Sequence, residues 1–172
     1  MKTQSFLLRA LSVLVLLVIG FTPVYAGTPQ PTVVDVSNRI TLHANETTIF
    51  GIVVSSTQRV LVRAVGPELA KFGVPNVNAD PTLTVFSGQT PIVTVDDWED
   101  QPIVNGKPLT TAAAISAAFQ ATGAFPLDSG STSAATMLTL APGAYTIQVH
   151  GVGGLAGEVL IEVYTVPDSV PN

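Results

Sequence analysis

The stretch Leu140-Ala-Pro-Gly-Ala-Tyr-Thr-Ile-Gln-Val-His150 contains the clearest strand signal in the chain. From Tyr145 to His150, apolar and polar side chains alternate, which is typical of a strand with one buried face and one face in water. The Pro-Gly turn before Tyr145 is also typical of a tyrosine corner, in which the hydroxyl bonds an upstream backbone group; a plain core aromatic is the alternative. This segment therefore predicts an antiparallel strand of a β-sandwich.

Similar β-branched segments on either side, separated by Gly, Pro, Asn and Asp, predict further strands. The nine predicted strands cover residues 32–36, 39–43, 48–55, 59–65, 82–86, 92–95, 136–140, 144–150 and 159–166. Two short helices interrupt them: residues 67–72, which end at Gly73, and residues 112–121, which are capped by Thr110 or Thr111. The predicted fold class is mainly all-β, an antiparallel two-sheet β-sandwich of about nine strands with two short helices.

The first 26 residues are typical of a secretory signal peptide. Lys2 and Arg9 accompany an apolar run from Leu11 to Phe21, and Val24-Tyr-Ala26 matches the small-x-small cleavage pattern. A membrane anchor is the alternative, but the run is shorter than the roughly 20 residues that cross a bilayer. We therefore expect cleavage near Ala26 and secretion to the periplasm, the cell surface or the extracellular space. Residues 27–172 would remain as a single sandwich domain with short flexible ends and no membrane span.

The composition excludes several classes of protein. Of the 172 residues, 47% are apolar and 11% are charged, which argues against a disordered chain. The formal net charge of -5 argues against a nucleic-acid partner bound through its phosphates. Because the chain has no cysteine, disulfides, thiol nucleophiles and thiolate metal sites are excluded, and stability must come from an apolar core.

Several segments together resemble a family of secreted bacterial β-domains that often lie near the C-terminus of large exported proteins. The matching segments include Arg59-Val-Leu-Val-Arg-Ala-Val-Gly-Pro67, Ala79-Asp-Pro-Thr-Leu-Thr84, Asp96-Asp-Trp98, Leu140-Ala-Pro-Gly-Ala-Tyr145 and Val149-His-Gly-Val-Gly-Gly154. The final third is also similar to the small sandwich domains appended to secreted peptidases. The resemblance implies a non-catalytic exported module of a functionally uncharacterised family.

The densest polar cluster is Asp96-Asp-Trp-Glu-Asp100, directly after a predicted strand. Such a loop offers carboxylates and backbone carbonyls, the oxygen ligands that Ca²⁺ prefers. The spacing lacks the ordered EF-hand pattern, so a simple solvated acidic turn is the alternative. We take Asp96, Asp97, Glu99 and Asp100 as candidate ligands for Ca²⁺, the one cofactor that the sequence suggests.

Three further side chains are candidates for ligand binding. Trp98, the only tryptophan, is either a stacking platform for a sugar ring or, as we favour, an anchor buried against the core. Arg59 and Arg63 share one face of a predicted strand. They either bind an acidic surface group or polysaccharide, or pair with Glu68 or Asp80 at a sheet edge, and we favour the pairing.

The sequence contains no recognisable catalytic constellation. His43 and His150 lie at a strand end and on the polar face of a strand, and there is neither a His-Glu-x-x-His nor a Gly-x-Ser-x-Gly motif. The sequence therefore predicts a non-catalytic secreted structural or interaction protein of the bacterial cell surface or extracellular matrix. Its partners would be polysaccharide, other surface proteins or further copies of itself, bound through exposed sheet edges. A Ca²⁺-dependent carbohydrate-binding module and a hydrolase with an unrecognised site are the alternatives.

Overall fold

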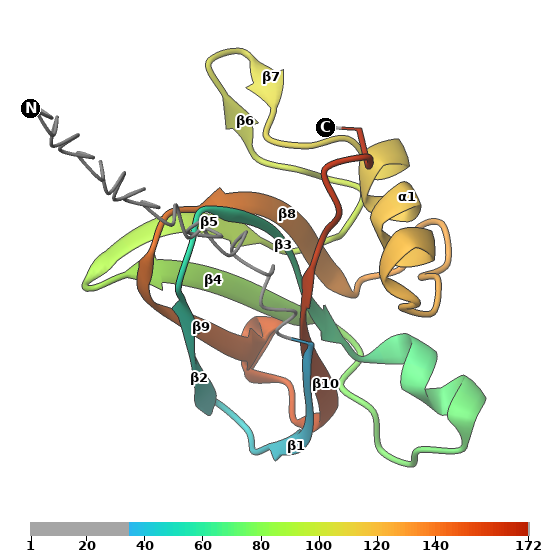
Figure 1. Ribbon diagram of the computed structural model, residues 1–172. Helices are drawn as coiled ribbons and strands as arrows, with labels where there is room; N and C mark the ends of the chain where they lie inside the picture. Colours follow the sequence, from blue (N-terminus) through green and yellow to red (C-terminus); the bar gives the residue numbers. More distant parts are fainter. Residues whose placement is uncertain (1–34, 172) are drawn as a thin grey trace, which may run out of the picture. The chain divides into compact units, whose positions relative to one another are not determined.

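The computed structural model describes residues 35–171, whose strands form two four-stranded sheets and a separate two-stranded hairpin (Figure 1). The strands are β1 (Val36–Leu42), β2 (Thr47–Val54), β3 (Gln58–Val65), β4 (Pro81–Ser87), β5 (Thr90–Val95), β6 (Ile103–Val104), β7 (Lys107–Pro108), β8 (Ala134–Leu140), β9 (Gly143–Gly151) and β10 (Gly157–Thr165). The helical elements are η1 (Pro67–Phe72), α1 (Ala112–Thr122) and η2 (Val152–Gly154). Within residues 35–171, no helix is long and apolar enough to cross a membrane.

The two large sheets are antiparallel, and the chain passes repeatedly from one sheet to the other. Sheet A has the strand order β1-β10-β3-β8, and sheet B has the order β2-β9-β4-β5. Only β4 and β5 are both consecutive in the chain and paired within one of these sheets. This crossing topology stacks the two sheets face to face, so that each buries one side against the other.

The main hydrophobic core lies between the sheets. Along β9, Ile147 and Val149 are fully buried, whereas Gln148 is half-buried and His150 is exposed. The same alternation occurs in the other strands of sheet B because successive side chains of a strand point to opposite faces. The alternation read from the sequence around Tyr145 therefore describes the real orientation of β9.

A second hydrophobic cluster covers the outer face of β3 and β8, which we call the covered face. Leu61 and Met137 point outward from these strands and are buried beneath α1, together with Ile115 and Phe119 of that helix. From Val60 to Val65, β3 is thus buried on both sides, which explains why five of these six residues are apolar.

Within the described residues, no comparable layer covers the outer face of sheet B, which we call the open face (Figure 1). Apart from Thr82 of β4, which is buried, its outward positions are exposed or half-buried. They include Ile49, Gly51 and Val53 of β2, Thr146, Gln148 and His150 of β9, Thr84 and Phe86 of β4, and Ile92 and Thr94 of β5.

The predicted fold class is confirmed: the protein is mostly β, with two large antiparallel sheets and few helices, and residues 35–171 contain ten strands rather than nine. The strands that were not predicted, β6 and β7, form a short hairpin around Asn105-Gly106, where Asn105 has a φ of 52°. Asn-Gly suits such a two-residue turn because both positions need positive φ. The predicted signal peptide, its cleavage near Ala26 and most of the predicted strand 32–36 lie outside the described residues.

Two local structures predicted from the sequence are present, the tyrosine corner before β9 and the N-terminal cap of α1. The Tyr145 hydroxyl donates a hydrogen bond of 2.9 Å to the Ala141 carbonyl, so the turn before β9 is a tyrosine corner. At the start of α1, the Thr111 hydroxyl accepts a hydrogen bond of 3.1 Å from Ala114 N, so Thr111 rather than Thr110 caps the helix.

Candidate functional site

Three carboxylates meet where β4 begins and β5 ends. Asp80 directly precedes β4, and Asp96 and Asp97 directly follow β5. The two strands are antiparallel, with Leu83 opposite Val95, so the residue before one strand lies beside the residues after the other. One oxygen from each carboxylate lies within 4.8 Å of the other two. We call these three residues the carboxylate cluster.

The carboxylate cluster holds its negative charge at an electrostatic cost. Burial, reinforced by the charges of Asp96 and Asp97, raises the pKa of Asp80 above its ordinary value of 3.8. Burial, reinforced by Asp96 and Asp100, likewise raises the pKa of Asp97. The Asp80 oxygen Oδ1 is buried and has no hydrogen-bond partner. Oxygen ligands of this kind suit a hard cation, whose charge would relieve the repulsion.

The carboxylate cluster contains only part of the predicted Ca²⁺ ligand set. Asp96 and Asp97 belong to it, whereas Glu99 turns away and accepts a hydrogen bond of 2.8 Å from Gly130 N. Asp100 is exposed and also lies outside the cluster. Asp80 was not among the predicted ligands. Its position directly before the strand that pairs with β5 is the sequence signal that identifies it.

Trp98 lies in the core, with 5% of its surface exposed. Its indole N–H donates a hydrogen bond of 2.9 Å to the Asp128 carbonyl, and its ring centre lies 5.7 Å from that of Phe119. The sequence offered a sugar-stacking platform or a buried anchor for this side chain. The structure places it as the anchor, because a ring closed off from solvent cannot stack on a sugar.

Arg63 is fully buried on the covered face rather than available at the surface. Its guanidinium lies over the rings of Phe119 and Phe125, at 4.7 Å and 4.5 Å from their centres. Its Nε lies 3.2 Å from the Glu162 carboxylate, and its Nη1 donates a hydrogen bond of 2.8 Å to the Phe125 carbonyl. Burial lowers the pKa of Arg63, and the charge of Glu162 opposes this effect most strongly. Arg63 is therefore a structural ion-pair partner, not a surface ligand site.

Arg59 lies on the same strand but binds the C-terminal segment. Its guanidinium donates hydrogen bonds of 2.5 Å to the Val170 carbonyl and 3.1 Å to the Pro171 carbonyl. The Arg59 carbonyl also accepts a hydrogen bond of 2.9 Å from Val166 N. Arg59 thus ties the last described residues to β3.

Neither of the acidic residues predicted to pair with the two arginines forms an ion pair with them in the described chain. Glu68 is buried, and its carboxylate accepts hydrogen bonds of 2.5 Å from the Ser133 hydroxyl and 3.2 Å from Asp128 N. Asp80 belongs to the carboxylate cluster. Glu162, the ion-pair partner that Arg63 does have, lies opposite it on the neighbouring strand β10.

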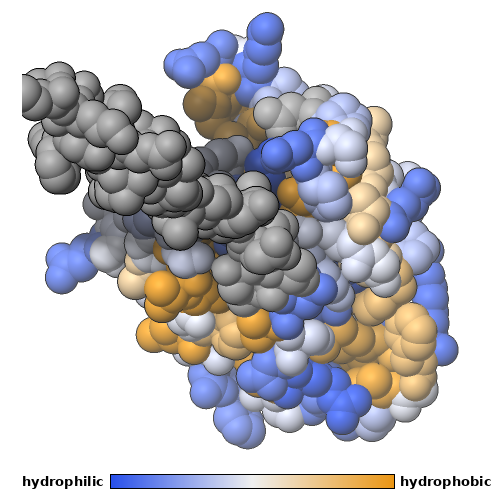
Figure 2. All heavy atoms as spheres, in the orientation of Figure 1, coloured by the Kyte–Doolittle hydropathy of each residue, from blue (hydrophilic) through white to orange (hydrophobic). Residues whose placement is uncertain are grey.

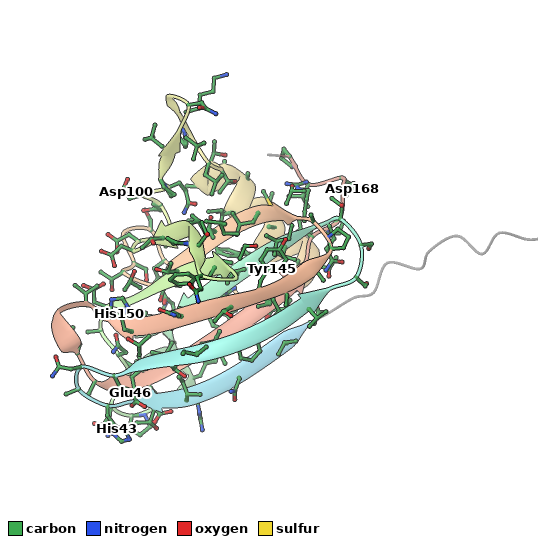
Figure 3. The ribbon with its side chains drawn as sticks, turned by 90° about the vertical axis from the view of Figure 1, so that its left-hand side faces the viewer. His43, Glu46, Asp100, Tyr145, His150 and Asp168 are labelled. Carbon is green, nitrogen blue, oxygen red and sulfur yellow. The ribbon has the colours of Figure 1, made fainter. Side chains whose placement is uncertain are left out.

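The two histidines of the described chain lie at one end of the sandwich, near Glu46 (Figure 3). His150 is exposed on the open face, and His43 is exposed beyond the end of β1. Glu46 accepts a hydrogen bond of 2.8 Å from the backbone N–H of His43. Within residues 35–171, no hydrogen bond joins either imidazole to a serine hydroxyl or a carboxylate.

The open face has an unusual charge distribution. The four strands of sheet B contain no Asp, Glu, Lys or Arg, whereas the strands of sheet A contain Arg39, Arg59, Arg63, Glu158 and Glu162. The open face also exposes apolar side chains: Ile49 is 66% exposed and Val53 is 73% exposed. Figure 2 shows hydrophobic surface in the region of β2. A neutral surface of threonine, glutamine and aliphatic groups is typical of a contact surface, because charged residues are depleted at the centre of interfaces.

Comparisons with known proteins give structural likenesses but no family. No protein-family model matches the chain, and no curated protein matches it. Among solved structures, it is similar to the pre-peptidase C-terminal domain of collagenase from Bacillus anthracis, with 11% sequence identity and a TM-score of 0.44. The similarity covers 75% of this chain and 88% of that one.

Proposed function

We propose that this chain is a non-catalytic, secreted structural or interaction protein of the bacterial cell surface or extracellular matrix. The observation that carries the proposal is the open face, where an entire four-stranded sheet presents polar uncharged and aliphatic side chains to its surroundings. Exposed apolar area of this kind marks interaction surfaces. The predicted signal peptide at residues 1–26 supports export.

The burial of the polar side chains that a catalytic site would require supports the same proposal. Arg63, Glu68 and Ser133 are buried, and each takes part in a contact that joins separate segments of the fold. Trp98 likewise joins the acidic loop to Asp128. These side chains stabilise the sandwich, so the face left for partners is the open face.

Binding to producing cells or their matrix tests the proposal. The Thr146→Asp variant places a charge on the open face, and Thr139→Asp places the same charge at an exposed position of sheet A. We expect the mature parent protein and Thr139→Asp to bind labelled cells or matrix, and Thr146→Asp to lose at least about tenfold in apparent affinity, equivalent to about 1.4 kcal/mol. Equal binding by the two variants would contradict a role for the open face. A hydrolytic activity abolished by one substitution would contradict the non-catalytic assignment.

The carboxylate cluster favours a second candidate function, a Ca²⁺-dependent carbohydrate-binding module. Because Trp98 is buried, a sugar would be held through a bound Ca²⁺ ion and the surrounding carboxylates rather than by ring stacking. Among the acidic residues and histidines of positions 35–171, Asp80, Asp96 and Asp97 form the one group close enough together to share the cation.

Thermal unfolding in the presence of Ca²⁺ tests this second candidate. A cation that binds the native state raises the melting temperature of the parent protein. Asp80→Asn should abolish the rise, whereas Asp100→Asn, an exposed acid of the same loop outside the cluster, should retain it. A glycan array with and without chelator then tests for sugar binding. If Ca²⁺ leaves the melting temperature of the parent unchanged, this candidate is excluded.

A further inference from the structure

Three of the four edge strands of sheets A and B carry features that hinder pairing with another chain. The β8 edge is capped, because Gln101 Nε2 donates a hydrogen bond of 2.8 Å to the Ala135 carbonyl and Trp98 N donates one of 3.0 Å to the adjacent Ser133 carbonyl. The β5 edge contains Pro91, and its pairing with β4 is interrupted by a register shift. Natural sheets use such caps, prolines and bulges to prevent edge-to-edge association.

The β1 edge is protected by charge. Arg39 lies in the middle of this strand, and its Nε lies 3.6 Å from the Glu158 carboxylate of β10. A second strand that paired here would approach this ion pair. Charged side chains are a common means of protecting an edge strand.

The remaining edge, β2, has none of these features among the described residues. Its sequence, Thr47-Thr-Ile-Phe-Gly-Ile-Val-Val54, contains no charge and no proline. It pairs with β9 in an unbroken register over its whole length, and within residues 35–171 it has no other partner strand. A long apolar edge without protection is typically a site of strand addition.

The sequence of β2 is complementary to itself about Gly51. On an edge strand, the unpaired backbone N–H and C=O groups belong to every second residue. In an antiparallel pair of identical strands these groups must meet, so one residue on the two-fold axis faces the same residue of the other copy. With Gly51 at that position, Ile49 faces Val53 of the other copy on the outer side, and Phe50 faces Ile52 on the inner side. Shifting the two-fold axis to Phe50 would place Ile49 opposite glycine and lose this apolar pair.

We propose that the protein forms a two-fold symmetric dimer by antiparallel pairing of β2 with β2 of a second copy, centred on Gly51. The two copies of sheet B then form one continuous eight-stranded sheet with an uncharged outer face. The chain as a whole carries a net charge of -5, and pairing along an uncharged strand brings no like charges into direct opposition. The inference rests on the proposed interaction function and names the partner and the contact.

Cysteine cross-linking tests the register, and the absence of native cysteine leaves no background. Nothing lies within 4 Å of a Cβ atom added at Gly51, so Gly51→Cys fits the monomer. Directly opposed residues of an antiparallel pair have Cα atoms about 4.5 to 5.5 Å apart, which suits a disulfide. We expect mature Gly51→Cys to form a covalent dimer under mild oxidation. Ile92→Cys, exposed on the same face at the opposite edge, should remain monomeric.

A second pair of variants separates the Gly51-centred register from other pairings. Ile49→Cys or Val53→Cys alone should stay uncross-linked. The variant that combines both substitutions should form dimers, because the thiol introduced at Ile49 in one copy then faces the thiol introduced at Val53 in the other. Cross-linking of Gly51→Cys and Ile92→Cys at equal rates would overturn the proposal, since it would indicate random collision.

Sedimentation equilibrium of the uncross-linked protein provides the independent measurement. Ile49→Lys should raise the dimer dissociation constant by about tenfold or more, because it removes two apolar cross-strand pairs and adds charge at the edge. Ile92→Lys should leave it unchanged. A parent protein that stays monomeric overturns the dimer, and dimers insensitive to Ile49→Lys overturn the contact. Either result leaves the proposed function standing if the same samples bind cells or matrix, whereas lost binding by every sample contradicts that function.

Discussion

Outward side chains of β3 and β8 such as Leu61 and Met137 lie beneath a layer that includes α1, whereas those of sheet B meet no such layer among the described residues (Figure 1). The covered face contains the buried ion pair of Arg63 and Glu162, and the open face contains no Asp, Glu, Lys or Arg. This distribution is the reverse of the usual one, in which charges lie in water and apolar groups lie inside. A surface in water could carry charges at little cost, so the lack of Asp, Glu, Lys and Arg on the open face is the observation behind the proposed contact surface.

The largest expected effect comes from breaking the ion pair on the covered face. Arg63→Ala leaves Glu162 buried without its counter-charge and removes the guanidinium from between Phe119 and Phe125. We expect the free energy of unfolding to fall by about 3 to 5 kcal/mol, the usual cost of leaving one member of a buried ion pair unpaired. Urea unfolding followed by tryptophan fluorescence measures it, because Trp98 lies in the same hydrophobic cluster.

The double variant Arg63→Met with Glu162→Leu is the matched control. It removes both charges and keeps apolar volume, so it should recover most of the lost stability, as replacement of buried ion pairs by apolar residues often does. If Arg63→Ala lowers the free energy of unfolding by less than about 1 kcal/mol, the covered face tolerates an unpaired Glu162 carboxylate. The ion pair would then not be required for the stability of this buried region.

An intermediate effect comes from the same kind of truncation on each face. Leu61→Ala removes a fully buried side chain from the covered face and should cost about 2 to 5 kcal/mol. Ile49→Ala removes a 66% exposed side chain from the open face and should change monomer stability by less than about 0.5 kcal/mol. Urea unfolding at a concentration where the protein is monomeric measures both. Similar losses would show that Ile49 is part of a packed core and would remove the contrast between the faces.

Much of the fold was predictable because its signals are local. The alternation from Tyr145 to His150 follows from strand geometry, and the Thr111 cap and the Gly123 stop place α1 between Ala112 and Thr122. The β6–β7 hairpin escaped prediction because each strand has two residues, too few for a period of two to be visible. The Asn105-Gly106 turn was its available signal.

The site was less predictable because it depends on which strands pair. A run of adjacent acids suggested Glu99 and Asp100 as Ca²⁺ ligands, but the carboxylate that lies beside Asp96 and Asp97 is that of Asp80, brought there by the β4–β5 register. The partner of Arg63 was missed for the same reason. Glu162 lies on β10, and that strand pairs with β3 despite the long chain separation. Local charge patterns in the sequence do not specify such contacts.

The smallest expected effect concerns the carboxylate cluster, in which Asp80 and Asp97 are half-buried and Asp96 is exposed. Within residues 35–171, none of the three forms an ion pair, so the cluster resembles neither the paired charges of the covered face nor the uncharged open face. The pKa of Asp97 is raised above 3.8 in the folded state. At a pH between 3.8 and this raised pKa, the folded state therefore binds more protons than the unfolded state. The stability that Asp97 contributes is therefore full below this window, falls as pH rises through it and stays lower at neutral pH. In the absence of divalent cations, Asp97→Asn should be more stable than the parent protein at pH 7 by less than about 1 kcal/mol. The difference should vanish once the pH falls below 3.8.

Asp168→Asn, an exposed acid elsewhere on the molecule (Figure 3), should show no such difference in urea unfolding across this pH range. A loss of stability in Asp97→Asn at pH 7 would instead mean that the ionised carboxylate is held by a favourable contact, and the cluster would then resemble the paired charges of the covered face.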